Sequence, residues 1–452
     1  MHVGWAVTLQ APADGPRPSF EQLRDHLAGR LAAAPSYRQR LAGLPLRIWE
    51  PAWIDDPEFE WGRHILPAVG STFTEMVDRA MSSPLDRDLP LWNMWVAPEL
   101  PDGRVGYIGK AHHGMVDGLA ALELVGLLFD LTPEAEPTER DTHEPRRPPS
   151  RRALGAEALR DMGARLRAVA RSPVALARSG IGFGGAAASL RRMGAALLDC
   201  LRPAPTSSLN GPSSPQRHHT RTHCSLQALR TIKEGFDTSL NDVVLAVAAG
   251  ALRRHAERRG ESPRRLKSIV PINVRDPSGD SDDLGNQLSF MWIDLPCHEP
   301  DPVRRLEAVH ADTSLRKVGL RAEATSAIVT AAAHGPRFVK ALLSWVFAHH
   351  RTANLIVSNL IGPPTQLFML GCELEEIYPI VPLTHRHALS IGLISVGDRA
   401  CFSLYSDAQA LPDADLLAED IQASVAELVA RAEGPSVTEA AARAVPEDPV
   451  PA

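Results

Sequence analysis

The sequence predicts two mixed α/β halves joined by a long crossover. Its 452 residues fit two or three domains. Hydrophobic residues make up 44% and charged residues 23%, which is typical of a globular protein and excludes global disorder. Strand-like and helix-like patterns alternate on both sides of a stretch at 133–152 that is rich in proline and charge and has almost nothing to bury.

The first half, residues 1–132, alternates between the two kinds of pattern. In chain order the periodicity predicts a strand, an amphipathic helix, two short strands around a Pro-Asp-Gly turn, and a second helix. These five elements are expected over Val3–Leu9, Phe20–Ala33, Trp92–Ala97, Val105–Lys110 and Leu119–Phe129.

The connection, residues 133–221, is a Pro- and Arg-rich linker followed by a basic helical crossover. We expect one or two helices over 153–202 and a loop over 203–215. The chain has 48 Lys and Arg against 54 Asp and Glu, but residues 146–202 alone carry a charge of +9, so the remainder carries −15. Such a basic segment, with leucine, valine and alanine between its arginines, can dock on an anionic membrane or droplet surface. A solvated cover, or helices packed on the core, is the alternative.

The second half, residues 222–433, is again mixed. A helix is predicted over Ser239–Arg259, because Ser239 and Asp242 form a capping-box pattern and Gly260 can end the helix. The other predicted elements are two strands, a hairpin across Gly397-Asp398 and a closing helix, over Ser268–Val274, Leu355–Asn359, Leu389–Val396, Ala400–Leu404 and Asp413–Ala432. Residues 434–452 are expected to form a disordered tail.

Composition excludes several classes of protein. The net charge of −6 argues against a nucleic-acid partner. None of the five cysteines forms a C-x-x-C pair, which excludes a zinc ribbon, and so few cysteines in a chain of this size indicate an intracellular protein. No secretory signal is visible, and the longest apolar runs, such as Val243–Leu252, are half of what a membrane span needs. We therefore expect a cytoplasmic protein whose membrane contact is peripheral.

The most informative stretch is Tyr107–Gly118, YIGKAHHGMVDG. A strand leads into His112 and His113, and Asp117 follows His113 by four residues at the start of a helix. Histidine accepts a proton near neutral pH, so this arrangement suits general-base catalysis, worth about 10²–10⁴-fold in rate. The alternative is a helix-capping Asp117 beside two solvated turn histidines.

HHGMVDG fits the HHxxxDG motif of chloramphenicol-acetyltransferase-like acyltransferases. Other motifs occur around it in order, and together they resemble the bacterial wax ester synthase/acyl-CoA:diacylglycerol acyltransferase family over roughly residues 1–433. They are WIDDPEF at Trp53–Phe59 with His64-Ile65, PLW at Pro90–Trp92, LNGP at Leu209–Pro212, NDVVLA at Asn241–Ala246, VPINVR at Val270–Arg275, LGN at Leu284–Asn286 and SNLIGP at Ser358–Pro363.

The resemblance implies two chloramphenicol-acetyltransferase-like domains with a tunnel at their junction. It also implies acyl transfer from acyl-CoA to diacylglycerol or a fatty alcohol, without a metal, a cofactor or a covalent acyl-enzyme. We expect contact with the inner face of the membrane or with lipid droplets. The family has a segment ahead of its first strand, whereas this chain starts almost at that strand, which predicts a late start or a shortened enzyme.

On this resemblance, His113 is the general base and His112 supports the site. Asp117 is structural and is expected to pair with an arginine such as Arg275, and Gly118 allows close packing at the start of the helix. Asn241 is expected to stabilise the tetrahedral oxyanion. The further positions that we expect to contact substrate are Asp242, Pro90, Leu91, Trp92, Arg275, Ser358 and Asn359.

Structural alternatives apply to several of these positions. Asn241 and Asp242 also suit the first turn of a helix. Pro90–Trp92 also suits core packing, and Ser358 and Asn359 suit a strand-end turn. Two other functions stay open: a carrier-protein-dependent acyltransferase acting on polyketide-type alcohols, and a lipid-binding protein with a vestigial site.

Three weaker patterns are set aside. Residues 180–185 fit G-x-G-x-x-G, but no strand precedes them. Residues 388–392 approximate a nucleophile elbow, but a strand-like pattern follows the serine where a helix is required. His218, His219 and His223 have no fourth metal ligand at suitable spacing, and we expect them in a solvated loop.

Overall fold

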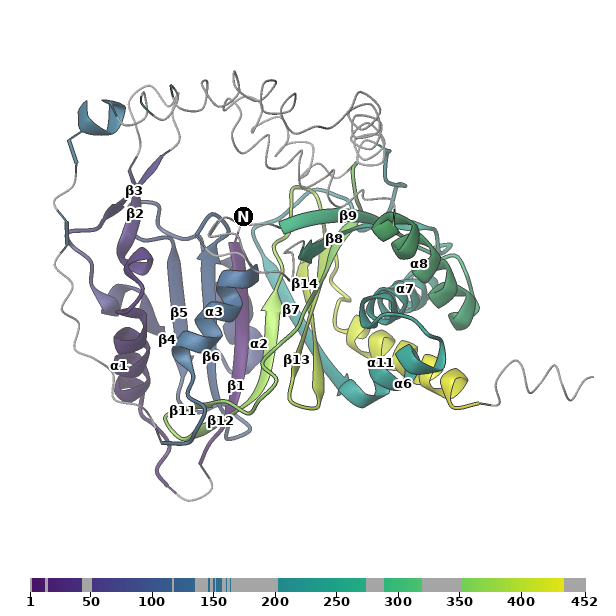
Figure 1. Cartoon of the computed structure of the whole chain (residues 1–452), viewed down its shortest axis with the longest axis horizontal. Helices are drawn as coiled ribbons and strands as arrows, with labels where there is room; N and C mark the ends of the chain where they lie inside the picture. The colour runs from purple at the N-terminus through teal and green to yellow at the C-terminus, as the bar shows by residue number, and fades with distance from the viewer. Residues whose placement is uncertain are drawn as a thin grey trace, which may run out of the picture.

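The structure is a computed structural model with two six-stranded mixed sheets that lie side by side (Figure 1). Its described residues are 2–12, 15–42, 51–115, 118–134, 145–146, 149–150, 152–156, 160, 163, 202–273, 288–318 and 351–434. The GxGxxG pattern, most of the basic crossover and residues 435–452 lie outside them. Among the described residues, no helix is both long and apolar enough to cross a membrane.

The first sheet has the strand order β11-β12-β1-β6-β5-β4, and helices α1, α2 and α3 belong to the same half of the molecule. The strands span His2–Gln10 (β1), Ile65–Pro67 (β4), Trp92–Ala97 (β5), Val105–His112 (β6), Phe368–Met369 (β11) and Cys372–Ile380 (β12). The helices span Phe20–Leu31 (α1), Phe73–Ser82 (α2) and Gly118–Leu128 (α3), and a separate ribbon pairs Gln39–Ala42 (β2) with Ala52–Asp55 (β3).

The second sheet has the order β7-β14-β13-β10-β8-β9. Its strands span Arg217–Ser225 (β7), Leu266–Asn273 (β8), Leu288–Leu295 (β9), Leu355–Leu360 (β10), Leu389–Val396 (β13) and Arg399–Asp407 (β14). Four helices pack in this half: Leu226–Gly235 (α6), Leu240–Arg258 (α7), Pro302–Val318 (α8) and Leu416–Ala432 (α11).

The second half of the sequence supplies two strands, β11 and β12, to the first sheet. β12 comes from the second half of the sequence, yet it pairs antiparallel with β1, from Gly4 opposite Ile380 to Gln10 opposite Glu373. Gly392 in β13 permits the close approach of β12, because a Cβ at this position would lie 2.5 Å from the Pro379 carbonyl oxygen. β12 therefore belongs to the first sheet and also packs against β13 of the second.

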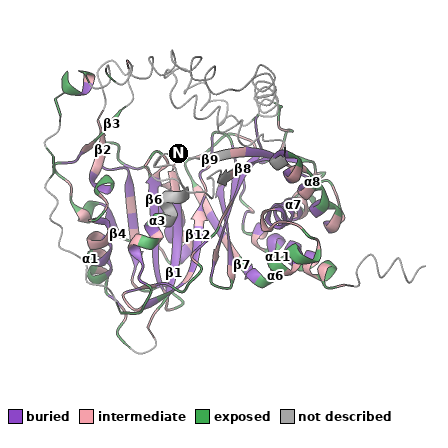
Figure 2. Ribbon diagram, in the orientation of Figure 1, coloured by how far each residue is buried: buried purple, intermediate pink, exposed green. Residues whose placement is uncertain are grey.

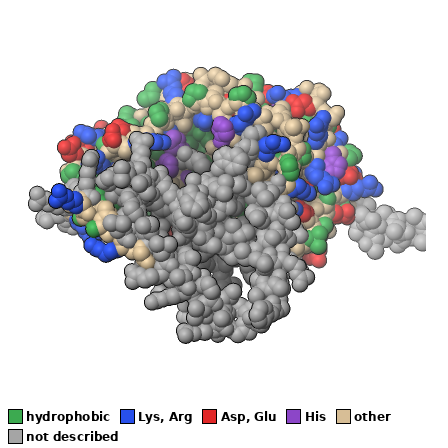
Figure 3. Space-filling model, turned by 90° about the horizontal axis from the view of Figure 1, so that it is seen from above, with side chains coloured by type: hydrophobic (Ala, Val, Ile, Leu, Met, Phe, Trp, Pro, Cys, Tyr) green, Lys and Arg blue, Asp and Glu red, His purple; other side chains and the backbone are tan. Residues whose placement is uncertain are grey.

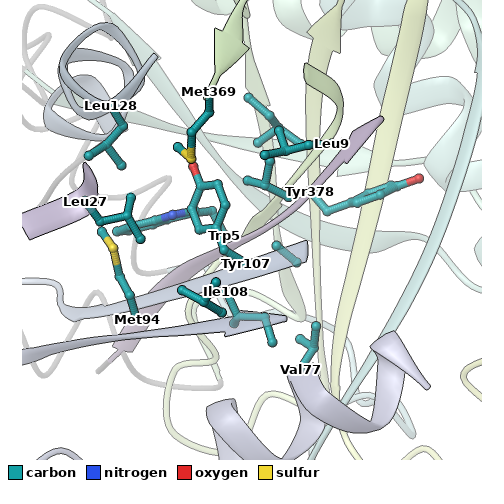
Figure 4. Close-up of a cluster of buried hydrophobic side chains, with 14 of the residues drawn as sticks. Trp5, Leu9, Leu27, Val77, Met94, Tyr107, Ile108, Leu128, Met369 and Tyr378 are labelled. Carbon is teal, nitrogen blue, oxygen red and sulfur yellow. The ribbon is translucent and has the colours of Figure 1, made fainter. Parts of the chain in front are cut away.

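Each half has its own core. In the first, the buried side chains come from β1, β6, α1, α2, α3 and β12, and Figure 4 shows Trp5, Leu27, Tyr107 and Leu128 lying close together among them. In the second, α7 is the central helix: every residue over 243–252 is buried, and the helix is covered by its neighbours (Figure 2). That apolar run is thus a core helix.

Most of the predicted elements are confirmed. α7 has both capping-box hydrogen bonds, and it ends before Gly260, whose φ of +70° is a left-handed conformation that favours glycine. The β13–β14 hairpin turns at Gly397, whose φ is +55°. α11 begins at Leu416, three residues later than predicted, and the serine of the rejected nucleophile-elbow pattern lies inside β13.

The expectation for the three histidines is wrong in one respect. His218, His219 and His223 lie on strand β7, where a solvated loop was expected. His219 is fully buried and contacts the Ser403 hydroxyl at 3.0 Å, and His223 lies 3.1 Å from a Glu376 oxygen. The partners of His219 and His223 are distant in sequence, so the residues around the three histidines do not by themselves indicate a strand.

Candidate active site

The histidine pair lies at the end of β6, in the interior of the first sheet. His112 is the last residue of the strand and lies opposite His2 of β1. Its backbone N–H donates to the Leu91 carbonyl at 2.8 Å, so the PLW segment fixes the point at which the strand ends. β1 starts at the upper edge of the sheet, and the view from above shows histidine side chains exposed on that face (Figures 1 and 3).

The ring of His112 is held in one orientation. The Gly114 N–H donates to its Nδ1 at 3.1 Å, so in the neutral ring the proton sits on Nε2. Burial lowers the pKa of His112 and favours this neutral form. His2 packs edge-on to it, with ring centroids 6.3 Å apart, and burial followed by the charge of Lys110 lowers the pKa of His2 to about 3. His112 and His2 are therefore two neutral imidazoles at the rim of the sheet.

His113 is the first residue beyond the strand and is half-buried. The turn that carries it is closed by the Met115 N–H, which donates to the His112 carbonyl at 2.8 Å. Gly118 opens α3, as predicted. Asp117 and Arg275 lie outside the described residues, so their pairing stays a prediction.

Lys110, which the sequence analysis missed, anchors the strand that carries the histidines. Its side chain is fully buried, and its Nζ donates to the carbonyls of Ala80 at 3.0 Å, Met81 at 3.2 Å and Ser83. These carbonyls end helix α2, where a cation is favoured. Burial, followed by the charge of Arg217, lowers the pKa of Lys110 to about 8. A lysine inside an apolar strand, in a chain with only five lysines, was the available clue.

The Asp242 side chain is engaged in hydrogen bonds within the fold, and its contact with substrate stays a prediction. Its buried carboxylate accepts hydrogen bonds from His310 Nδ1 at 2.9 Å, Thr313 Oγ1 at 2.6 Å and the Ser239 N–H at 3.0 Å. Burial alone raises the pKa of Asp242, but these hydrogen bonds outweigh it and the pKa is lowered. Asp242 thereby ties the start of α7 to α8.

Asn241 differs from its neighbour. It is half-buried in the first turn of α7, and its amide has no hydrogen-bond partner among the described residues. Its side chain is thus able to bind a ligand, whereas that of Asp242 is committed to the fold.

The PLW and upstream tryptophan-containing motifs form one packed unit. Pro90, Leu91 and Trp92 are buried, and the Trp92 indole N–H donates to the Tyr37 carbonyl at 2.6 Å. The ring of His64 stacks on Trp92, with ring centroids 4.7 Å apart, and the ring of Phe59 also stacks on His64, with centroids 5.2 Å apart. Pro90–Trp92 therefore lies in the core, whereas Trp53 of the upstream motif is 38% exposed. A role in contacting substrate stays a prediction.

The end of β10 reaches the junction between the halves. Ser358 is buried and Asn359 half-buried, and both pair in parallel with β13. A small apolar cavity of about 40 Å³ is lined by Leu360 and Ile394 from the second sheet, and by Trp5, Tyr107 and Leu124 from the first half. The strand that carries Ser358 and Asn359 therefore meets the strands and the helix that position the histidine pair.

Charged groups also join the halves. Glu376 of β12 accepts from Thr8 Oγ1 at 3.0 Å and from Arg104 at 2.9 Å. His218 lies between Asp78 of α2 and Asp415 near α11, at 2.7 and 2.8 Å. No group of three or more metal-ligating side chains occurs among the residues that the structure describes.

Comparison with known proteins gives concordant matches. Residues 1–244 match the family described as the wax ester synthase/diacylglycerol acyltransferase catalytic domain, and residues 284–429 match the WS/DGAT C-terminal domain. A probable diacylglycerol O-acyltransferase of Mycobacterium tuberculosis is 30% identical, with 97% of this chain and 94% of that protein covered.

Solved structures show the same fold. A wax ester synthase/diacylglycerol acyltransferase from Marinobacter aquaeolei is 22% identical with a TM-score of 0.67, covering 96% of this chain and 95% of that one. The first condensation domain of the CDA synthetase is 15% identical with a TM-score of 0.57, covering 96% and 92%. The expected two-domain mixed α/β fold is confirmed.

Proposed function

The chain belongs to the wax ester synthase/diacylglycerol acyltransferase family, and we propose that it transfers a fatty acyl group from acyl-CoA to the hydroxyl of diacylglycerol or of a long-chain alcohol, with His113 as general base. The assignment to His113 rests on the hydrogen bond and the protonation of the other histidine, His112. Because Nδ1 of His112 already accepts the Gly114 N–H and its Nε2 holds the proton, neutral His112 has no basic nitrogen left for the acceptor hydroxyl.

The reaction needs two proton transfers at one imidazole. His113 takes the proton of the acceptor hydroxyl as its oxygen attacks the thioester carbonyl, and a tetrahedral oxyanion forms. The intermediate collapses by breaking the C–S bond, and the imidazolium of His113 returns its proton to the departing CoA sulfur. This path has no covalent acyl-enzyme and calls on no metal or cofactor. The base contributes about 10²–10⁴-fold to the rate.

Asn241 is the proposed oxyanion donor. Its unengaged amide at the start of α7 suits this role, and one such donor is worth about 10²–10³-fold in kcat. Asp117 and Gly118 are proposed to shape the turn, Asp117 through a pair with Arg275. Ser358 and Asn359 are proposed to contact substrate from the end of β10.

The test is an assay with purified protein and labelled palmitoyl-CoA. Diacylglycerol, hexadecanol and a carrier-protein thioester donor are supplied in separate arms, and products are separated by thin-layer chromatography. We expect triacylglycerol or wax ester from acyl-CoA. Product only from the carrier-protein thioester would favour the polyketide-type alternative, and tight acyl-CoA binding without turnover would favour a vestigial lipid-binding protein.

We further propose peripheral contact with the inner face of the membrane or with lipid droplets. The charge of +9 over residues 146–202 supports it, since each basic residue near an anionic surface contributes about 1 kcal/mol. Flotation with anionic liposomes should fall as salt is raised. Flotation that responds neither to anionic lipid nor to salt would contradict surface docking.

A further inference from the structure

A cavity of about 470 Å³ lies at the C-terminal end of α7, remote from the proposed site. Its lining includes His255, fourteen residues beyond Asn241 on the same helix, which at about 1.5 Å per residue separates the two by about 21 Å. The volume is within the range of small-molecule sites and holds on the order of 15 water-sized groups. It is therefore a candidate for a second ligand.

The buried residues that line the cavity are apolar except for one imidazole. Leu209, Leu252, Leu266 and Cys297 are buried lining residues. His255 is 3% exposed, and neither of its ring nitrogens has a hydrogen-bond partner within the part of the chain that the structure describes. Its nearest ion-pair partner is Asp413, whose Oδ1 lies 3.8 Å from Nε2. Buried polar atoms nearly always have a partner, so this imidazole indicates a group that the cavity receives.

The charges around His255 define the chemistry of that group. Burial lowers the pKa of His255, so the ring is neutral, with one donor and one acceptor nitrogen. Glu261 also lines the cavity and is held by Ser208 at 2.8 Å and Arg259 at 3.1 Å, while Asp413 accepts from Arg259 at 2.8 Å. Arg264 also lines the cavity, and the charges of Arg258 and Arg259 act on the imidazole beside those of Glu261 and Asp413, so cations and carboxylates offset one another and leave no excess charge for an ion to neutralise. A hydroxyl can bond either ring nitrogen without adding charge.

We infer that this cavity binds a neutral alcohol of medium chain length, with its hydroxyl on His255 and its chain along Leu209, Leu252 and Leu266. The site is separate from the acyl-transfer site and does not depend on turnover. Its ligand resembles an acceptor alcohol in polarity but is held where no thioester is proposed to bind.

The test measures binding of labelled 1-decanol by equilibrium dialysis without acyl-CoA. Ala256 lines the cavity, so Ala256→Phe fills it, while Ala426→Phe on the exposed face of α11 is the matched control. We expect Ala256→Phe to lose one equivalent of bound decanol that the control retains, and His255→Leu to bind that equivalent at least tenfold more weakly. The rate with saturating palmitoyl-CoA and hexadecanol should be unchanged in both.

A second readout does not depend on how the variants fold. A diazirine analogue of decanol, photolysed on the unmodified protein, should label peptides that contain residues 252–266 in addition to any label near His113. Equal stoichiometry in the two phenylalanine variants, no label over 252–266, or displacement of decanol by decanoate as effective as by unlabelled decanol would each overturn the inference.

Discussion

Replacing His218 with glutamine tests the charged link between the two halves. The ring donates from both nitrogens, to Asp78 in the first half and to Asp415 in the second, which requires the imidazolium form. The hydrogen bond to Asp78, opposed by burial and reinforced by Asp415, raises the pKa of His218 from 6.5 to about 9. The side chain is only 21% exposed. Since a tenfold change in proton affinity is worth about 1.36 kcal/mol, this corresponds to about 3 kcal/mol of stabilisation.

The pH dependence of this stabilisation follows from the direction in which the pKa of His218 shifts on folding. A pKa raised on folding gives stability that is fully present below pH 6.5 and is lost as the pH rises through about 9. The assay is urea unfolding of the unmodified protein and His218→Gln at pH 6.0 and 9.5, with exposed His298→Gln as control. Burial lowers the pKa of Lys110 to about 8, so the contribution of Lys110 to stability rises with pH. This contribution is the same in the unmodified protein and in His218→Gln, so it cancels in the difference between them.

We expect the difference in unfolding free energy between the unmodified protein and His218→Gln to shrink by about 3 kcal/mol between the two pH values. His298→Gln should show no such change. A difference that is constant with pH, or that grows as the pH rises, would refute the charged link.

Further substitutions separate positioning, chemistry and packing. Lys110→Met unties β6 from the end of α2, so kcat should fall about tenfold with KM unchanged, and urea unfolding should show a loss of about 1–3 kcal/mol. Asn241→Ala should lower kcat by about 10²–10³-fold with the unfolding midpoint unchanged. Asp242→Ala should instead cost about 2–4 kcal/mol in urea unfolding, because His310 and Thr313 lose their acceptor. An Asn241→Ala variant that unfolds early, or an Asp242→Ala variant that is stable, would reverse these roles.

Local patterns predicted the elements that position the site. The strand ending in two histidines, the capping box at Ser239 and the glycine turn at Gly397 each depend on neighbouring residues, and each was found where the sequence placed it. Residue type and spacing were enough for the capping box and the turn because no distant partner decides them, whereas the end of the strand is also set by the distant Leu91 carbonyl.

Features that depend on distant partners were not predictable in this way. β12 carries Glu373, Glu375 and Glu376 and so does not resemble a sheet interior, but Glu376 is neutralised by Arg104, 272 residues away. His218 resembles a loop residue until Asp78 and Asp415 are placed beside it. Lys110 does not fit the apolar pattern of its strand, and only the three carbonyls at the end of α2 explain how its charge is buried.

The central claim is that His113, and not His112, is the base for acyl transfer. The most direct measurement is kcat with labelled palmitoyl-CoA and saturating acceptor for His113→Ala, with His112→Ala and the exposed His298→Ala in parallel. We predict a loss of about 10²–10⁴-fold for His113→Ala, a smaller loss for His112→Ala and none for His298→Ala. Full turnover by His113→Ala, in a protein that unfolds like the unmodified chain, would contradict the account.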